Sequence, residues 1–415
     1  MEKDIERIPF DRIESLAGKK LKVVGPESLD LFLASSRYLA QDIFASKPIP
    51  PFDTSEKDGF AVRSKDLKNA SAKHPVKLRV VGVAKAGEKP RPPLVKGDCV
   101  RIFTGAYLPL NADVVVMQEE VSYNENEDIV EFNKPVDPGT NIFKKGSDIK
   151  DGELLFSKGH LLYPEDIYLL ASAGISKVSV LKKLKVGVLA TGDELTSNPN
   201  AQKDGFVLDV NRPVLLHHLE LCGYSPQDAG LARDDVSDIS THIKKSIHHL
   251  DALITTGGSS VGKVDMVSES LRSIGAHRVF HGVKLRPSST AGLSIYDSKP
   301  IFILSGLTQS CLVALYAIVI PTLRKMTGLG FTFNSVILTK LDEDFRVRGE
   351  TGFKRAVWVR VQNKDGTLRA IPSMVSSHSR SILHKCHGFF IGDSGSLIKK
   401  GTVIPIIILR NPERG

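Results

Sequence analysis

The chain has few cysteines and no long apolar run. Its four cysteines, Cys99, Cys222, Cys311 and Cys386, are scattered over 415 residues and form no Cys-x-x-Cys pair. This pattern argues against a structural zinc site and against a disulfide framework, and it fits a reducing cytoplasm. No apolar run reaches the roughly 20 residues that a membrane helix needs, and the charged first residues show no signal peptide. We therefore expect a cytoplasmic protein with no membrane segment.

The chain also lacks the usual signs of a nucleic-acid-binding protein. Its net charge is +9, but the basic residues are spread along the chain with acids among them, and no basic tail is present. No RNP-type aromatic motif occurs either. The positive excess therefore favours a small anionic substrate over nucleic acid, because a general basic bias attracts anions without specifying an extended groove.

Composition shifts divide the chain into four expected regions. Residues 26–45 have apolar residues at helical spacing, with Pro26 and Glu27 suited to a first turn, and predict a helix. Short Val- and Ile-rich runs bounded by Gly, Pro and Asp predict strands. The expected regions are a helical and extended linker region (1–50 and 137–183), a small β domain (51–136), an α/β domain (184–329) and a C-terminal β domain (330–415).

The α/β region alternates buried strands with helices. The runs "KVGVLATG", "DALITTGG" and "KPIFILSG" predict three buried strands, and the segments between and after them predict helices that end at Gly223 and Gly275. Strands alternating with helices of this length predict a parallel sheet with both faces covered.

The second of these strands runs into a stretch, Ile254 to Asp265, that partly matches a nucleotide-binding P-loop. Gly257, Gly262 and Lys263 fit its G-x-x-x-x-G-K part. The next residue should be Ser or Thr, whose hydroxyl holds Mg²⁺, but it is Val264. No Walker-B-type strand is evident either, so the sequence does not favour a P-loop ATPase, and a phosphate loop of another kind stays open.

Glycines and hydroxyl residues follow all three predicted strands. In an open α/β sheet, ligands bind beyond the carboxyl ends of the parallel strands, and backbone N–H groups there suit an anion. A second hydroxyl-rich loop, Ser376 to Ser381, is either a solvated loop or an anion contact through Ser377 and Arg380. The candidate substrate contacts at the strand ends are Thr191, Gly192, Asp193, Gly257, Gly258, Ser259, Ser260, Gly262 and Gly306.

Acidic residues lie among these candidate phosphate contacts. Asp193 and Glu194 follow the first strand, Asp265 follows the second, and Asp234 and Asp235 follow another expected strand, "SPQDAGLA". Such acids would repel a phosphate unless a cation intervenes, and Mg²⁺ held by one or two carboxylates plus substrate oxygens resolves the conflict. The alternative is that the acids cap helices. We favour capping for Asp235, and function for Asp193 and Glu194 together.

Several segments together resemble one enzyme family. "PPFDTSEKDGFAV", "RIFTGAYLPLNADVVVMQEE", "GTNIFKKGSD", "VGVLATGDEL" and "DALITTGGSSVGKVD" are similar, in this order, to the motifs of the molybdenum-insertion enzymes of molybdenum cofactor synthesis. This is the MoeA family, also seen in the E domain of gephyrin. The motifs cover the chain from end to end. By this resemblance the Gly-Lys pair is accidental, and its loop is similar to a molybdopterin-phosphate loop.

The resemblance implies a fold, a reaction and a set of site residues. The fold is multidomain α/β plus β, with a parallel-sheet α/β molybdopterin-binding domain, a small β domain, a helical and extended linker region and a C-terminal β-barrel-like domain. The implied reaction inserts molybdenum from molybdate into adenylylated molybdopterin and releases AMP, with Mg²⁺ as cofactor. By motif position, the functional residues are Asp58, Thr104, Asp148, Glu194, Asp234 and Asp265, of which Glu194, Asp234 and Asp265 would hold the metal.

The resemblance also implies partners. Family members are elongated homodimers, and the site is expected between the linker and β domain of one subunit and the α/β domain of the other. The enzyme that adenylylates molybdopterin is a further possible partner. Neither nucleic acid nor a membrane is expected.

Two loops depart from the family pattern. The family has Pro-Gly-Lys-Pro where this chain has "PSST", so that Ser288, Ser289 and Thr290 replace Gly, Lys and Pro. Ser288 and Ser289 are still expected to contact the substrate. In "LSGLTQS", Gly306 is kept, while both prolines and the asparagine of the family's Pro-Gly-Asn-Pro are gone. The retained acids favour an active molybdenum transferase. The altered loops leave open a non-catalytic or altered-ligand relative that binds a pterin or nucleotide phosphate, or a scaffold.

Overall fold

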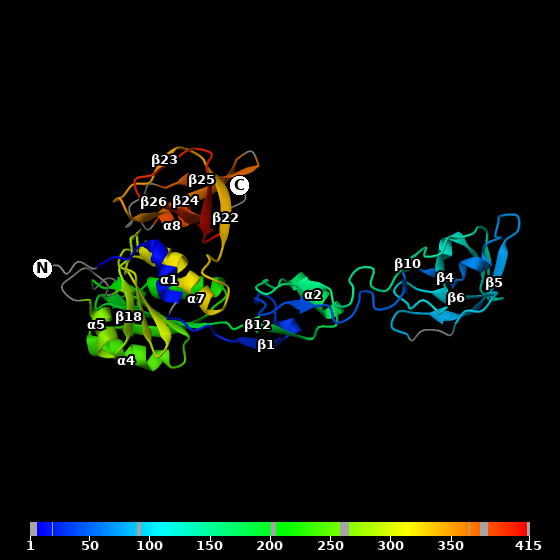
Figure 1. Cartoon of the computed structure of the whole chain (residues 1–415), viewed down its shortest axis with the longest axis horizontal. Helices are drawn as coiled ribbons and strands as arrows, with labels where there is room; N and C mark the ends of the chain where they lie inside the picture. Colours follow the sequence, from blue (N-terminus) through cyan, green and yellow to red (C-terminus); the bar gives the residue numbers. More distant parts are fainter. Residues whose placement is uncertain are drawn as a thin grey trace. The chain divides into compact units, whose positions relative to one another are not determined.

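The computed structural model describes residues 6–18, 20–88, 93–200, 205–257, 265–364, 366–373 and 381–412. The contacts group the chain into two compact units, Glu27–Val180 and Met1–Pro26 with Leu181–Gly415 (Figure 1). The described residues contain no helix that is both long and apolar enough to cross a membrane. The expected linker region (1–50 and 137–183) includes residues of both units, and the boundaries of all four expected regions stay a prediction.

The unit Glu27–Val180 contains a six-stranded β-sheet. Its strands lie in the order β7-β4-β6-β5-β9-β8, and all neighbours are antiparallel except β5 and β6. Phe60 and Phe132 are fully buried in its core. The strands are β4 (Gly59–Val62), β5 (Val76–Ala84), β6 (Asp98–Ile102), β7 (Val114–Met117), β8 (Ser122–Asn124) and β9 (Ile129–Phe132).

The same unit contains a pair of chain segments that run out to this sheet and back. Three short strand pairs join them: β1 (Pro26–Asp30) with β12 (Lys177–Leu181), β2 (Ile43–Phe44) with β11 (Leu154–Phe156), and β3 (Thr54–Ser55) with β10 (Ile142–Phe143). The helix α2 (Pro164–Ser172) packs beside them and is followed by Gly174, whose φ is +86°. Three single-turn helices complete the unit: η2 (Leu31–Leu33), η3 (Ser64–Asp66) and η4 (Gln118–Glu120).

The predicted helix over residues 26–45 is wrong. The segment begins with strand β1, whose residues alternate between exposed and partly buried, and continues through η2 into a turn at Ser36, where φ is +62°. Its backbone hydrogen bonds go to the returning chain, as from Leu31 N–H to the carbonyl of Ser176, 2.9 Å away. Hydrogen-bond partners far away in the chain, such as Ser176 for Leu31, therefore decide the structure of this segment, against its local helical spacing.

The α/β part of the other unit has a six-stranded mixed sheet in the order β16-β13-β17-β21-β20-β18. The first four strands are parallel, as predicted, while β20 runs antiparallel to both of its neighbours. The sequence did not predict this reversal. The strands are β13 (Lys185–Thr191), β16 (Ser225–Ala232), β17 (Ala252–Thr256), β18 (His277–His281), β20 (Gly292–Tyr296) and β21 (Lys299–Leu304), with a small pair, β14 (Leu195–Thr196) and β15 (Val207–Leu208), beside them.

Helices cover both faces of this sheet. Alternate strand residues divide between two cores: Leu253 and Ile303 pack with α4 (Val236–Ile247) and α5 (Met266–Ser273), while Ile254 and Phe302 pack with α3 (Asn211–Leu221) and α6 (Thr308–Ala314). The chain continues from α6 through a π-helical turn, η6 (Leu315–Val319), into α7 (Ile320–Met326). The short helices η1 (Phe10–Arg12) and α1 (Ile13–Gly18) lie in this unit as well.

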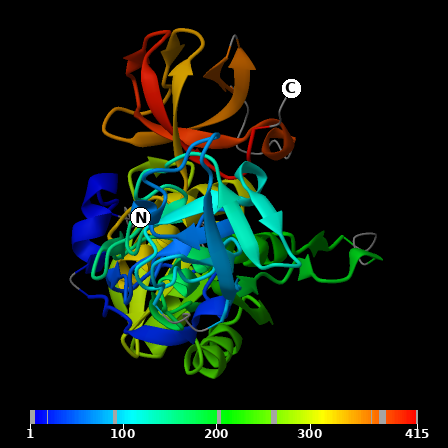
Figure 2. The same ribbon diagram turned by 90° about the vertical axis from the view of Figure 1, so that its right-hand side faces the viewer.

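The C-terminal part is a closed β-barrel. Its strands follow the order β24-β25-β22-β28-β26, and a further pairing of β24 with β26 closes the ring; Figure 2 shows these strands in orange and red. Together with the two sheets described above, the barrel confirms the expected fold class. The elements are β19 (Leu285–Arg286), which adds to β24, then β22 (Val336–Leu341), β23 (Phe345–Arg346), β24 (Lys354–Lys364), β25 (Thr367–Pro372), α8 (Ile382–Lys385), β26 (Gly388–Asp393), β27 (Leu397–Ile398) and β28 (Val403–Ile408).

Candidate active site

The carboxyl ends of three parallel strands come together at one edge of the sheet. Gly257, directly after β17, approaches the end of β13 so closely that an added Cβ would lie 2.1 Å from the carbonyl oxygen of Thr191. Its φ of +95° also favours glycine. A Cβ on Gly306, after β21, would lie 3.8 Å from the Cα of Gly257. Three predicted substrate contacts, Thr191, Gly257 and Gly306, therefore share one backbone-lined surface.

Carboxylates gather beside this surface. The carboxylate of Asp193 accepts a hydrogen bond from the backbone N–H of Asp234, 3.1 Å away. Burial raises the pKa of Asp234, and the negative charges of Glu194 and Asp193 raise that pKa further. Among the described residues, the Oδ1 atom of Asp234 is buried without a hydrogen-bond partner. Three acids thus lie close together, and within the described residues no ion pair joins any of them to a basic side chain.

This arrangement fits a cation that takes only part of its coordination from the protein. The described residues contain no group of three His, Cys, Asp or Glu side chains placed to hold a metal ion. Mg²⁺ usually keeps several waters and binds through one or two carboxylates plus substrate phosphates. The unpartnered oxygen of Asp234 and the neighbouring Glu194 match that requirement.

Asp265 is a helix cap in the structure. Its carboxylate accepts hydrogen bonds from the backbone N–H of Ser268 at 2.9 Å and from the Ser268 hydroxyl at 2.7 Å, at the start of α5. It also lies 3.3 Å from Nε2 of His281. Within the described part of the chain, no contact joins Asp265 to Glu194 or Asp234. Its expected role as their fellow metal ligand stays a prediction, and the capping alternative now has direct support.

The same alternative is confirmed for Asp235. Its side chain accepts from the backbone N–H of Asp238 at 2.9 Å and caps α4. His281, beside Asp265, is a buried imidazole. Burial lowers the pKa of His281, Asp265 opposes this effect, and the charge of Arg278 adds to it.

In the other unit, two predicted site residues meet directly. The carboxylate of Asp58 accepts hydrogen bonds of 2.8 Å from both the backbone N–H and the hydroxyl of Thr104. These two bonds lower the pKa of Asp58, so the side chain stays ionised. Asp148 is exposed, and its backbone N–H donates to the carbonyl of Ile49.

The altered loop at residues 287–290 does not present a row of free hydroxyls. The Ser288 hydroxyl is buried and donates to the carbonyl of Ser310 at 2.7 Å, with φ of Ser288 at +102°. Ser289 is partly buried, and its carbonyl accepts from the N–H of Val283. Ser288 is therefore used to fix its own loop against α6, and its expected contact with substrate stays a prediction.

The side chain of Arg286, just before the loop at residues 287–290, contacts the barrel. Lys284 and Arg286 precede this loop in the chain and could replace the missing lysine charge if their side chains turned toward the site. The Arg286 guanidinium lies 5.2 Å from the centre of the Phe353 ring and 3.8 Å from the Glu350 carboxylate, both in the barrel. The backbone of Lys284 pairs with Ile8 and Lys354. Arg286 is therefore held by the barrel domain.

Sequence reasoning missed Asn211, which ties the strand ends together. Its side-chain N–H₂ group donates to the carbonyl of Gly306 at 2.7 Å and to the hydroxyl of Thr256 at 3.2 Å. Its side-chain oxygen accepts from the Thr308 hydroxyl at 2.7 Å. The only local signal is an amide residue at the start of α3. Thr308 is one of the residues of the altered loop, so this loop is tied to α3 through Asn211.

Gly192 is a further candidate substrate contact among the described residues. Gly192 lies between Thr191 and Asp193 at the end of β13, and an added Cβ there would lie 2.8 Å from a carboxylate oxygen of Glu194. Gly258, Ser259, Ser260, Gly262, Ser377 and Arg380, together with Lys263 and Val264, lie outside the described residues.

Comparison with known proteins supports the resemblance seen in the sequence. Residues 8–174 match the MoeA N-terminal region (domain I and II), and residues 187–325 match a probable molybdopterin binding domain. A molybdopterin molybdenumtransferase from Bacillus subtilis is 32% identical over 383 residues, which span 90% of this chain and 87% of that protein. The chain belongs to the MoeA family. A second molybdopterin molybdenumtransferase, from Staphylococcus aureus (strain COL), is 34% identical over 74% of this chain and 73% of that protein.

Solved structures agree with the MoeA assignment. A molybdopterin biosynthesis MoeA protein from Pyrococcus horikoshii superposes with a TM-score of 0.84 at 28% identity, covering 98% of this chain and all of that one. Because these relatives are molybdopterin molybdenumtransferases and a MoeA protein, this MoeA-family chain is a transferase of molybdenum cofactor biosynthesis.

Proposed function

We propose that this chain transfers molybdenum from molybdate to adenylylated molybdopterin and releases AMP, with Mg²⁺ as cofactor. The observation that carries this proposal is the set of uncompensated carboxylates of Asp193, Glu194 and Asp234 beside the glycine-lined strand ends. A phosphate ligand on that backbone surface would be repelled unless a cation lay between it and the acids.

Each part of the site has a distinct task in this proposal. The close-packed backbone at Gly257 and Gly306 lets a phosphate approach N–H groups without side-chain interference. Glu194 and Asp234 would hold Mg²⁺, which neutralises phosphate charge and makes AMP a better leaving group. Asp58 keeps its negative charge because Thr104 donates two hydrogen bonds to it, and this pair orients the Thr104 hydroxyl.

A second candidate function keeps the fold and changes the ligand. The Ser288 hydroxyl is bonded to Ser310, and Arg286 is held by Phe353 and Glu350, so the loop at residues 287–290 supplies little charge to a pterin phosphate. This observation favours a non-catalytic or altered-ligand relative, or a scaffold, that binds a pterin or nucleotide phosphate more weakly than its family does.

Molybdate-dependent release of AMP from adenylylated molybdopterin separates the two functions. The native chain should release AMP only when molybdate is added, because only transfer of molybdenum cleaves the adenylyl group. Glu194→Gln should lower the rate at least a hundredfold, since it removes a charge that holds the cation.

The matched control for this assay is Glu220→Gln, an exposed glutamate on α3 with no described side-chain contact. It should keep the native rate. Tight binding of adenylylated molybdopterin without any AMP release by the native chain would instead establish the altered-ligand function.

We also propose that the chain works as a homodimer in the cytoplasm, with an active site completed by the second subunit and a substrate supplied by the molybdopterin adenylyltransferase. Four unpaired cysteines support a reducing compartment. The MoeA assignment supports the dimer. Sedimentation of the full chain at micromolar concentration tests it, and a single monomeric boundary would contradict it.

A further inference from the structure

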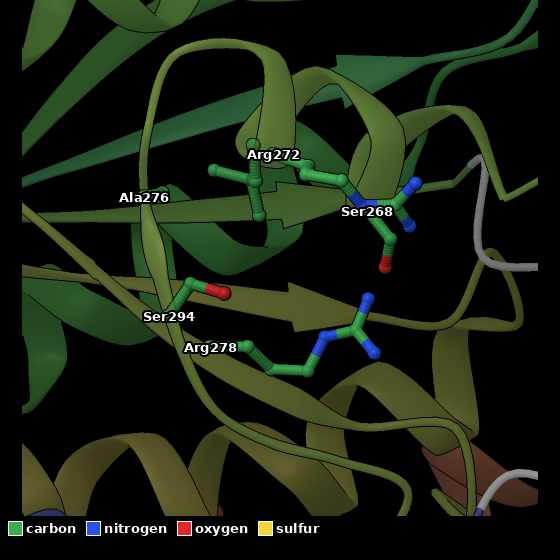
Figure 3. Close-up of a pocket in the computed structure, with 6 residues that line it drawn as sticks. Ser268, Arg272, Ala276, Arg278 and Ser294 are labelled. Carbon is green, nitrogen blue, oxygen red and sulfur yellow. The ribbon is translucent and has the colours of Figure 1, made fainter.

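A cavity of about 310 Å³ lies beside α5, on the strands β18 and β20 (Figure 3). Its walls carry two guanidinium groups and two hydroxyls, and none of the described residues that line it is acidic. The lining residues are Ser268, Leu271, Arg272, Ala276, Arg278 and Ser294.

The fold brings the polar groups together from three elements. Ser268 and Arg272 are four residues apart on α5, so they share one face of the helix, and a helical side chain leans toward the N-terminal end. Arg278 on β18 lies directly opposite Ser294 on β20 in the antiparallel pairing, so these two share one face of the sheet. Figure 3 shows both guanidinium groups at the end of the cavity where Ser268 lies.

The two arginines are not neutralised by the protein. Among the described residues, neither the Arg272 nor the Arg278 guanidinium makes a hydrogen bond or an ion pair. Glu269, three residues before Arg272 on α5, forms no ion pair with it within the described structure. Asp265, a partly buried acid at the start of the same helix, is engaged by Ser268 and His281 instead. The cavity therefore carries a local excess of positive charge.

Of the two serines, only Ser294 adds a hydrogen-bond donor to the two guanidinium groups. The proton of the Ser268 hydroxyl is used by Asp265, so this group offers a ligand no donor. The Ser294 side chain is only 3% exposed, and its hydroxyl has no hydrogen-bond partner in the described part of the chain. The Ser294 hydroxyl lines the cavity and is therefore able to donate to an acceptor that enters it.

We propose that this cavity binds a tetrahedral oxyanion with two negative charges, either free or as the phosphate group of a larger molecule. Each guanidinium presents a planar pair of N–H donors that matches two oxygens of such an anion. Ser294 donates to a third oxygen. Leu271 and Ala276 give the cavity an apolar wall. The proposal does not depend on molybdenum transfer.

Calorimetric titration of the full chain tests this binding site, with inorganic sulfate and phenyl phosphate as probes. Each should bind the native chain, and Arg272→Gln and Arg278→Gln should each weaken binding about tenfold, because each removes charge-assisted hydrogen bonds. The double variant should show no binding at this site. Ser294→Ala should weaken binding about threefold and serves if an arginine variant fails to fold.

The control is Arg348→Gln, which removes the same charge from an exposed position in the barrel domain and should leave both affinities unchanged. Tighter binding of sulfate identifies a free oxyanion as the ligand, and tighter binding of phenyl phosphate identifies a phosphate ester; either order upholds the site. Native affinity in the double variant, or no binding of either probe to the native chain, would overturn it. Because AMP release is not measured, these results leave the transferase proposal unaffected.

Discussion

At the scale of single residues, Asp234 carries a charge that its surroundings oppose. Burial and the carboxylates of Glu194 and Asp193 raise the pKa of Asp234 above its ordinary value of 3.8. Because its pKa is higher in the folded chain than in the unfolded chain, ionisation of this carboxyl group lowers the stability of the fold. The destabilisation from ionised Asp234 is absent below pH 3.8. It grows as the pH rises above that value and is complete above the folded-state pKa. A bound cation would remove that destabilisation.

Asp234→Asn should therefore leave the melting temperature at pH 7 equal to or above the native value in metal-free buffer, because it removes a repelled charge. The melting temperatures of the native chain and of Asp234→Asn should approach each other as the pH falls toward 4. Scanning calorimetry between pH 4 and pH 8 measures both. A clearly lower melting temperature for Asp234→Asn at pH 7 would mean that its carboxylate stabilises the fold, contrary to the unpartnered Oδ1 atom.

At the scale of elements, Asp265 at the start of α5 caps this helix and is also an expected catalytic residue. Asp265 caps the helix through Ser268, and capping depends on a side-chain oxygen, which asparagine also supplies. Asp265→Asn should therefore lose AMP release and keep the native melting temperature. Asp265→Ala should cost about 1 kcal/mol of unfolding free energy as well, measured by urea unfolding.

Asp235→Ala, at the equivalent cap of α4, is the matched control for Asp265. It should lose a similar amount of stability and keep its AMP release. Native AMP release by Asp265→Asn would show that Asp265 is a cap and nothing more.

The altered loop at residues 287–290 is the second element whose chemistry is testable. With the Ser288 hydroxyl turned to Ser310 and Arg286 held by the barrel, no lysine charge faces the ligand from this loop. Ser289→Lys should therefore bind molybdopterin about tenfold more tightly, since a charge-assisted hydrogen bond replaces a neutral one. Ser289→Met introduces a side chain of similar length without a charge, so it should leave the affinity for molybdopterin unchanged. Fluorescence titration measures both affinities. Unchanged affinity in Ser289→Lys would mean that another cation already serves the phosphate.

At the scale of the whole molecule, features set by nearby residues were predicted from the sequence and features set by distant partners were not. The buried strands β13, β17 and β21 and the helices that end at Gly223 and Gly275 follow from local patterns. The pairing of β1 with β12, the reversed strand β20 and the closure of the barrel depend on segments far apart in the chain.

The candidate site divides in the same way. Motif positions identified Thr191, Gly257 and Gly306, which the fold brings together, and Asp58 with Thr104, which meet directly. The contacts of Asn211 with Thr256 and Thr308 could not be predicted, because they cross from α3 to two other elements. Nor could the inward turn of Ser288, since its partner is the Ser310 carbonyl at the start of α6.

The most direct test of this account is the Mg²⁺ dependence of AMP release by the native chain in the presence of molybdate. With excess chelator the rate should fall to the background of adenylylated molybdopterin alone, and adding back Mg²⁺ should restore it, because the acids at Asp193, Glu194 and Asp234 otherwise repel the phosphate groups. Full AMP release in excess chelator would contradict the central claim that these carboxylates act through a bound cation.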